Sequence, residues 1–257
     1  GRTRPRNEDC CLVSHVSDGI NASIGNFIVA VVCNGLGGMN QGREASIRAA
    51  SSFVASLCNS SLSDWMEKIK EAIDVANADV YGVLRGGGGT TLSSIIIPKT
   101  GPKLLCHVGD SRIYGIEADR TLKQLSRDDT MNALLNRRDG VLNPTKDSRL
   151  LQFVGMGDEM EPQIDFIPDS FRSLLLTSDG AHDLPHEVLQ RVVSAASGGN
   201  DLVKKLLSLA DMTGGYDNAS AIFMQLDGET YLYVDVIETE SQTLLPHDTL
   251  SICIIAS

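Results

Sequence analysis

The chain has 257 residues, of which 42% are hydrophobic and 21% are charged, as expected of a globular protein with a substantial core. Its net charge of −11 argues against nucleic acid or an anionic membrane as the main partner, because both repel an acidic surface. No apolar run approaches the ~20 residues that span a bilayer, and no signal peptide is apparent, so we expect a cytoplasmic location. Nothing in the sequence indicates oligomerisation, and we expect a monomer.

Apolar periodicity predicts the elements of the first half. A continuous apolar run at 27–33 is typical of a buried strand, and residues 41–58 and 62–84 carry apolar side chains at helical spacing. A run of four glycines, 86–89, should end the second helix. Three consecutive strands are then expected at 91–97, 104–108 and 112–116.

The second half repeats this plan after a polar segment. Residues 131–149 are charged and weakly periodic, which indicates a partly helical surface excursion. Strands are expected at 163–167, 173–177 and 219–226, helices at 185–195 and 201–211, and a tail of two strands at 231–237 and 249–256 that could form a hairpin on a sheet edge. This order lacks regular β-α-β alternation. We therefore predict a single α+β domain over 1–257, with antiparallel sheets and helices packed outside.

Several predicted strands meet an acidic residue or its amide counterpart at one end. The positions concerned are Asn34-Gly35, Gly109-Asp110, Asp179-Gly180 and Asp217. Carboxylates that converge from strand ends make a site for a hard cation, because oxygen ligands suit Mg²⁺ and Mn²⁺. Asn34 is the exception, since it places an amide where this pattern calls for a carboxylate.

Such a site could hold two metal ions. A pair of ions ~3.5–4 Å apart can activate a water and stabilise displacement at phosphorus. The centre also needs a cation for the phosphate oxygens, and the N-terminal segment supplies Arg4 together with the acids Glu8 and Asp9. Arg4 is chosen by spacing alone, and Arg2 and Arg6 flank it.

Six segments, taken in order, resemble the motifs of the type 2C metal-dependent protein Ser/Thr phosphatases, in their compact bacterial form. They are Gly1-Arg2-Thr3-Arg4-Pro5-Arg6-Asn7-Glu8-Asp9, Asn34-Gly35-Leu36-Gly37-Gly38-Met39, Gly89-Thr90-Thr91, Gly109-Asp110-Ser111-Arg112, Ser178-Asp179-Gly180 and Asp217-Asn218-Ala219-Ser220. The resemblance covers about residues 1–226 and leaves 227–257 as extra C-terminal strands. It implies an αββα sandwich, in which two antiparallel sheets are each flanked by a helix pair.

The resemblance also implies roles for single residues. Arg4 would hold the phosphate and Asn34 would stand at the metal-bridging position. The remaining metal-site residues would be Glu8, Asp9, Gly35, Asp110, Asp179 and Asp217, with Asp110 serving a third, weaker ion. The implied reaction is hydrolysis of phosphoserine or phosphothreonine in proteins by a metal-bound hydroxide, with Mn²⁺ or Mg²⁺. By analogy, the phosphoprotein would be a bacterial Ser/Thr kinase or its target, and Ser178 and Ser111 would not be nucleophiles.

Besides the extra residues after about 228, the chain departs from the family pattern at two places. A family segment that contains a histidine is replaced by Ser126-Arg127-Asp128-Asp129-Thr130. We interpret Asp128, Asp129 and Asp158 as solvated loop acids, with the alternative that an acid near the segment 131–149 serves the third metal. His182 is interpreted as a surface histidine and His107 as a packed strand residue. Six cysteines without C-x-x-C spacing fit buried core positions in a reducing cytoplasm.

The second departure, Asn34, bears directly on function. An amide offers one neutral oxygen where an aspartate offers two oxygens and a charge, so it bridges two cations poorly. We expect weaker metal binding and much reduced turnover. Asn34 could be engineered or natural, and the alternative function is a natural pseudophosphatase that binds a phosphoprotein or partner without catalysis.

Overall fold

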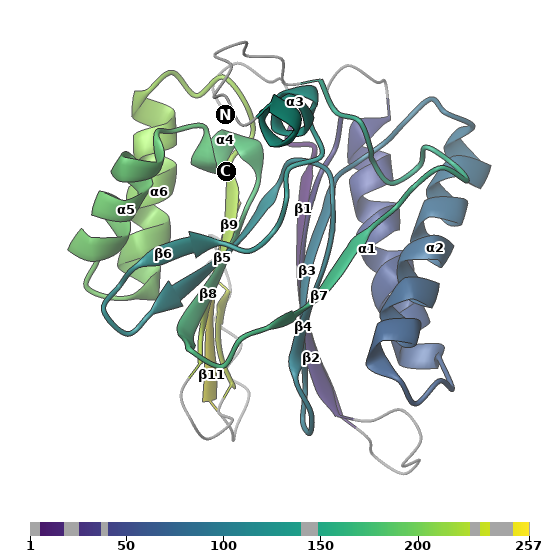
Figure 1. Ribbon diagram of the computed structural model, residues 1–257, viewed down its shortest axis with the longest axis horizontal. Helices are drawn as coiled ribbons and strands as arrows, with labels where there is room; N and C mark the ends of the chain where they lie inside the picture. The colour runs from purple at the N-terminus through teal and green to yellow at the C-terminus, as the bar shows by residue number, and fades with distance from the viewer. Residues whose placement is uncertain are drawn as a thin grey trace.

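A computed structural model describes residues 6–17, 26–36, 41–139, 149–226, 232–236 and 249–256. Two β-sheets lie face to face in the centre, and a helix pair covers the outer face of each (Figure 1). The α+β class and the αββα sandwich expected from the sequence are thereby confirmed. No helix within these ranges is long and apolar enough to cross a membrane.

The first sheet has five strands in the order β1-β2-β3-β4-β7, and all neighbours are antiparallel. Its strands are β1 (Asp9–Val16), β2 (Phe27–Asn34), β3 (Leu92–Pro98), β4 (Lys103–Val108) and β7 (Gln163–Ile167). Helices α1 (Gly42–Asn59) and α2 (Trp65–Leu84) cover it. Asp64 caps α2 by accepting a hydrogen bond from Glu67 N at 3.0 Å. Arg85 ends the helix in a left-handed conformation, just before the predicted glycine stop.

The second sheet has six strands in the order β10-β11-β9-β8-β5-β6. They are β5 (Arg112–Glu117), β6 (Leu122–Gln124), β8 (Phe171–Thr177), β9 (Ser220–Gln225), β10 (Leu232–Val236) and β11 (Thr249–Ala256). Helices α5 (His186–Ala195) and α6 (Gly199–Met212) pack on its outer face. The short helices α3 (Met131–Asp139) and α4 (Asp179–His182) lie at one end of the sandwich, at the top of Figure 1.

Three apolar layers hold the four structural layers together. Along β2, the side chains of Val29 and Val31 point to the helix pair, whereas Ala30 and Val32 point to the second sheet. A strand buried on both faces needs apolar residues at every position, which explains the continuous run at 27–33. The third layer lies between the second sheet and α5 and α6.

The structure differs from the sequence predictions at a few elements. Strands β1 and β6 and the single-turn helix α4 were not expected. The tail strands do not form a hairpin, because β10 pairs with β11 in parallel and β11 pairs with β9 antiparallel. A parallel pair needs a crossover connection of a dozen or more residues, and the chain between Val236 and Thr249 is of that order.

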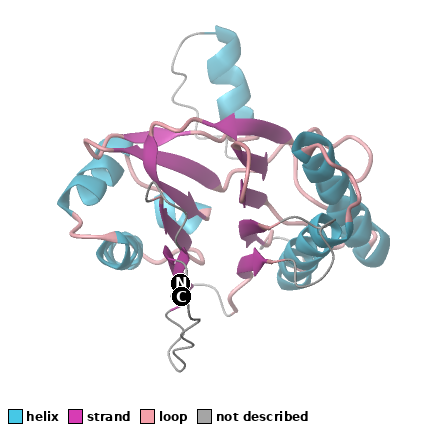
Figure 2. Ribbon diagram, turned by 90° about the horizontal axis from the view of Figure 1, so that it is seen from below, coloured by secondary structure: helices cyan, strands magenta, loops and turns pink. Residues whose placement is uncertain are grey.

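Both sheets direct strand ends to the same end of the sandwich. β1 starts there, β2, β4 and β8 end there, and β5 and β9 start there, close to α3 and α4 (Figure 1). The view from below shows the helix pairs on opposite flanks and α3 projecting from the sandwich (Figure 2). The loops at this end carry the acidic residues singled out in the sequence.

Candidate functional site

Four strand ends from the two sheets bring the predicted residues together. Asp9, at the start of β1, pairs with Asn34, at the end of β2. Asn34 Nδ2 donates a hydrogen bond of 2.6 Å to Oδ1 of Asp179, the second residue after β8 and the first of α4. Asp217 precedes β9, which is the neighbour of β8. The site therefore spans the interface between the sheets.

Two glycines allow the backbone to approach closely at these turns. A Cβ atom on Gly35 would lie 2.4 Å from the backbone carbonyl of Gly42, and one on Gly180 would lie 2.1 Å from the carbonyl oxygen of Asn218. Neither backbone can yield easily, so a larger residue would push the end of β2 away from the start of α1, or α4 away from the turn before β9. The Asn-Gly and Asp-Gly pairs thus serve close packing at the site.

Hydrogen bonds fix the N-terminal acids. Glu8 N donates to Asn218 Oδ1 at 3.0 Å, which ties the start of β1 to the start of β9. Asp9 is buried, and its Oδ2 accepts a hydrogen bond of 2.8 Å from Ser178 Oγ, while Oδ1 has no partner within the described chain. Ser178 Oγ in turn accepts from Ser220 N at 2.9 Å. Ser178 therefore positions an acid, in line with its expected role as a motif residue.

The threonine and serine of two further motifs form a bridge between strands. Asn34 N donates to Thr91 Oγ1 at 2.9 Å, and Thr91 N donates to the Asn34 carbonyl oxygen at 2.9 Å. Thr91 Oγ1 also hydrogen-bonds with Ser111 Oγ at 2.7 Å, next to Asp110. This bridge joins the end of β2 to the turn that carries Asp110.

We call Asp9, Asp110, Asp179 and Asp217 the acid cluster. Their negative charges repel one another. Burial raises the pKa of the Asp179 carboxyl to about 7. The negative charges of its neighbours Asp110, Asp217 and Asp9 contribute to this raised value, after burial as the largest cause. Burial likewise raises the pKa of Asp110 and that of Asp9 to about 6 each. Such shifts mean that negative charge is concentrated here without full compensation.

The acid cluster fits a divalent cation in charge, and an amide, Asn34, lies beside it. A cation would neutralise the carboxylates and would satisfy the orphaned Asp9 Oδ1. However, Asn34 directs an N–H at Asp179, and within the described ranges no three Asp, Glu, His or Cys side chains converge closely enough to hold a metal by themselves. The predicted residues Glu8, Gly35 and Asp110 lie at this same end, whereas Arg4 falls outside the described residues.

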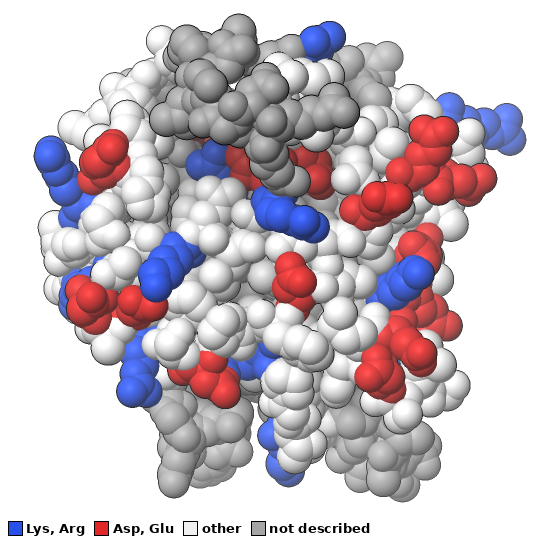
Figure 3. Space-filling view, in the orientation of Figure 1, with Lys and Arg blue, Asp and Glu red and all other residues white. Residues whose placement is uncertain are grey.

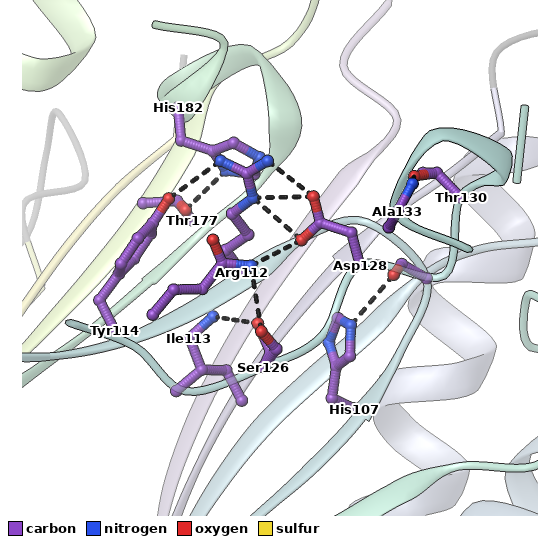
Figure 4. Close-up of polar contacts among 12 residues, drawn as sticks. His107, Arg112, Ile113, Tyr114, Ser126, Asp128, Thr130, Ala133, Thr177 and His182 are labelled. Carbon is purple, nitrogen blue, oxygen red and sulfur yellow. Dashed lines mark hydrogen bonds and ion pairs between the residues drawn. The ribbon is translucent and has the colours of Figure 1, made fainter. Parts of the chain in front are cut away.

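A second charged group beside the acid cluster was not predicted. Arg112 on β5 clasps Asp128, with Nε 3.0 Å from Oδ1 and Nη2 2.6 Å from Oδ2, and Nη1 donates to the Tyr114 hydroxyl at 3.3 Å (Figure 4). We call Arg112, Tyr114 and Asp128 the arginine network. Although burial acts in the opposite direction, hydrogen bonding to Asp128 raises the pKa of Arg112. The interpretation of Asp128 as a solvated acid is therefore wrong.

Asp129 was also misjudged as a solvated residue. Its Oδ2 accepts a hydrogen bond of 2.9 Å from Gly109 N, and its own N donates to the Gly109 carbonyl oxygen at 2.7 Å. Gly109 has a φ of +108°, a conformation that favours glycine. The acid at the position of the missing histidine therefore fixes the turn that carries Asp110. Only its place within the motif signalled this role.

The two histidines near the site are both buried. His107 Nδ1 hydrogen-bonds with Ser93 Oγ at 2.9 Å, and its Nε2 lies 3.0 Å from the Gly109 carbonyl oxygen, which confirms a packed strand histidine. His182 is not on the surface as expected. It is buried, and its Nδ1 lies 2.8 Å from Thr177 Oγ1. Helix α4 folds it back onto β8, which no local pattern indicates.

No protein-family model matches the chain, and no curated protein is significantly similar to it in sequence. Solved structures do resemble it. The Ser/Thr phosphatase Stp1 of Staphylococcus aureus matches with a TM-score of 0.77 and 22% identity over 89% of this chain and 92% of that one. The PPM Ser-Thr phosphatase MsPP of Mycobacterium smegmatis, solved with cacodylate, matches with a TM-score of 0.71 and 26% identity over 88% and 94%. The phosphatase PstP/Ppp of Mycobacterium tuberculosis matches with 0.69 and 23% over 88% and 94%. This chain has the fold of these bacterial phosphatases.

Proposed function

We propose that the chain is a protein Ser/Thr phosphatase that hydrolyses phosphomonoesters with the help of divalent cations, and that Asn34 weakens it. The observation that carries the proposal is the acid cluster, in which strand ends of both sheets gather carboxylates with raised pKa values at one end of a phosphatase fold. A bound Mn²⁺ or Mg²⁺ would activate a water and neutralise phosphate charge. Phosphorylated proteins, such as a Ser/Thr kinase or its target, are the substrates that the fold suggests by analogy.

In this proposal the side chains take the roles that the family resemblance implies. Asp179 and Asp217 are the candidate direct ligands, and the Gly35 carbonyl oxygen a further one. Glu8 and Asp9 stand beside them and orient water, and Asp110 serves a weaker site. Arg4 is the proposed phosphate-binding cation. Ser178, Thr91 and Ser111 hold these groups in place through the hydrogen bonds described above.

Asn34 explains why activity should be low. Its Nδ2 donates to the Asp179 oxygen that a cation would otherwise take, at 2.6 Å. A metal must break that hydrogen bond and then finds only a neutral oxygen on the amide. Replacing Asn34 by aspartate removes one of the two donors to this oxygen, leaving Gly180 N at 2.7 Å, and adds a charge and a second oxygen. Both changes favour metal binding.

The decisive test compares this chain with Asn34→Asp. We expect Mn²⁺-dependent phosphate release from a phosphothreonine peptide to rise by more than about 100-fold, since even supporting residues of metal sites change activity 10–100-fold. Mn²⁺ affinity, measured by titration calorimetry, should rise in parallel. The double variant Asn34→Asp/Asp179→Asn is the matched control and should lose both gains. Equal activity and equal Mn²⁺ affinity of the parent chain and its Asn34→Asp variant would contradict the proposed effect of Asn34.

One observation favours a different class of function. The Asn34–Asp179 hydrogen bond links an amide directly to the acid cluster, as a protein that only binds a partner could do. Such a pseudophosphatase would bind a phosphoprotein or another partner through this surface. The calorimetric titration separates the two functions. A site that takes up no Mn²⁺ even with Asn34→Asp supports the binding protein.

A further inference from the structure

The outer face of the α5–α6 helix pair carries an apolar groove. The inner faces of both helices are used up against the second sheet, through residues such as Leu189, Val193 and Leu206. The groove between the two helices has a volume of about 470 Å³, and its apolar lining includes the exposed Met212 and the half-buried Val188 and Val192, of which Val192 also packs against the inner layer. Met212 is 82% exposed, more than any other large hydrophobic side chain in the described residues. Apolar side chains left open in this way commonly mark a binding surface.

The charges that line the groove are all of one sign. Arg191, Lys204 and Lys205 border it, and no aspartate or glutamate does. Lys205 pairs with Asp201 at 2.7 Å, but Arg191 and Lys204 have no carboxylate partner in the described part of the chain. Elsewhere both signs are interspersed, as the face shown in Figure 3 illustrates. On a chain with net charge −11, a basic rim around an apolar floor is a local reversal of the prevailing charge.

The spacing of the lining residues fits a helix. Val188, Val192 and Ala195 follow one another at i, i+4 and i+7 along α5, and Lys205, Ser208 and Met212 do so at i, i+3 and i+7 along α6. The two rows run for about two helical turns, which is the length over which an amphipathic helix places its anchor side chains in a groove.

We propose that this groove binds an acidic amphipathic helix of a partner protein. Apolar anchors of the partner would cover Met212 and Val192, and its carboxylates would face Arg191 and Lys204. Because the rest of the chain is acidic, the basic rim also directs an acidic partner to this one surface. The groove lies on α6, whose last residue precedes Asp217 by only a short turn. The inference does not depend on hydrolytic activity and can be tested with Asn34 in place.

The experiment uses fluorescence anisotropy with three labelled synthetic helices. The first carries leucines at i, i+4 and i+7 among glutamates, the second the same leucines among lysines, and the third alanines among glutamates. We expect the chain to bind the first helix, and to bind it more tightly at low ionic strength than at physiological ionic strength. The other two should bind at least about tenfold more weakly, because each lacks one half of the recognition.

Matched variants locate the binding surface. Arg191→Glu with Lys204→Glu should weaken the glutamate–leucine helix by about tenfold, whereas Lys70→Glu with Lys99→Glu, at two exposed positions elsewhere, should leave it within about twofold. Met212→Gln should also weaken binding, and Val75→Gln, at an exposed valine of α2, should not. Circular dichroism melts check that all variants fold. In methionine-methyl NMR, the Met212 resonance should shift during the titration.

Four outcomes would overturn the proposal. The first is that the lysine–leucine helix binds as tightly as the glutamate–leucine helix. The second is that the Arg191→Glu/Lys204→Glu variant binds the glutamate–leucine helix as the parent chain does. The other two are results that identify a different occupant of the groove. Binding to phosphatidylserine vesicles that is lost in that variant would indicate a lipid surface instead. Sedimentation that shows self-association of the chain, abolished by Met212→Gln, would indicate a second copy.

Discussion

The acid cluster and the arginine network lie side by side, yet they treat charge in opposite ways. In the arginine network, Asp128 accepts hydrogen bonds from Nε and Nη2 on one edge of the Arg112 guanidinium, which compensates its charge directly. In the acid cluster, Asp179 lies near other carboxylates and accepts hydrogen bonds from the neutral N–H groups of Asn34 and Gly180. The two groups interact electrostatically, because the charge of Asp128 also raises the pKa of Asp110. The paired charges of Arg112 and Asp128 stabilise the fold, whereas the uncompensated carboxylates lie where a bound cation could neutralise them.

The largest effect is expected from removing Asp128, the carboxylate that compensates the charge of Arg112. Asp128→Ala leaves the largely enclosed Arg112 without its partner, and we expect a loss of about 2–3 kcal/mol in the free energy of unfolding, below the full cost for a buried pair because both side chains keep some solvent contact. The melting temperature should fall by roughly 5–10 °C. Asp169→Ala, which removes the exposed partner of Lys103, is the control and should change nothing measurable. An equally small effect of both changes would show that the arginine network is not a stabilising unit.

Removing a carboxylate from the acid cluster should instead raise the free energy of unfolding. In chelator-treated protein, Asp179→Asn removes a charge that burial and neighbouring acids disfavour, and the amide oxygen can still accept from Asn34. We expect stabilisation on the order of 1–2 kcal/mol at pH 8, measured by urea unfolding. The exposed Asp119→Asn serves as control. Destabilisation by Asp179→Asn would mean that this carboxylate is compensated after all, and the contrast between the two groups would fail.

The sequence predicted the acid cluster and missed the arginine network for a physical reason. Asp179 and Asp110 stand beside glycines at the ends of apolar runs, so local pattern and motif order reveal them. Arg112 and Asp128 meet only because β5 passes the segment that follows β6, and no spacing along the chain indicates such a contact. His182 was misplaced for the same reason, since α4 is a single turn without periodicity.

The fold was predictable to a similar extent. Elements with a repeated apolar period were located, because three core layers demand that period. The edge strand β1 was missed, since most of its residues are only partly buried and its pattern is mixed. The parallel pairing of β10 with β11 was mistaken for a hairpin, because strand direction depends on where the connection crosses and not on the strand residues.

The smallest expected effect concerns the histidine next to the arginine network. Burial lowers the pKa of His182 well below its ordinary value, and the charges of Arg112 and His107 lower it further. A histidine that is neutral in the folded state but can ionise when unfolded stabilises fully above its unfolded pKa of about 6.5, and this contribution is lost as the pH falls below it. The parent chain should therefore lose stability when the pH falls from neutral to about one unit below 6.5. In His182→Gln this loss of unfolding free energy should be smaller by about 1 kcal/mol. Urea unfolding at a series of pH values measures this difference, and His186→Gln, at an exposed position, should leave the pH dependence of the parent chain. If both variants kept the parent slope, His182 would have to be charged in the folded chain, and the network beside it would need a carboxylate to compensate two cations instead of one.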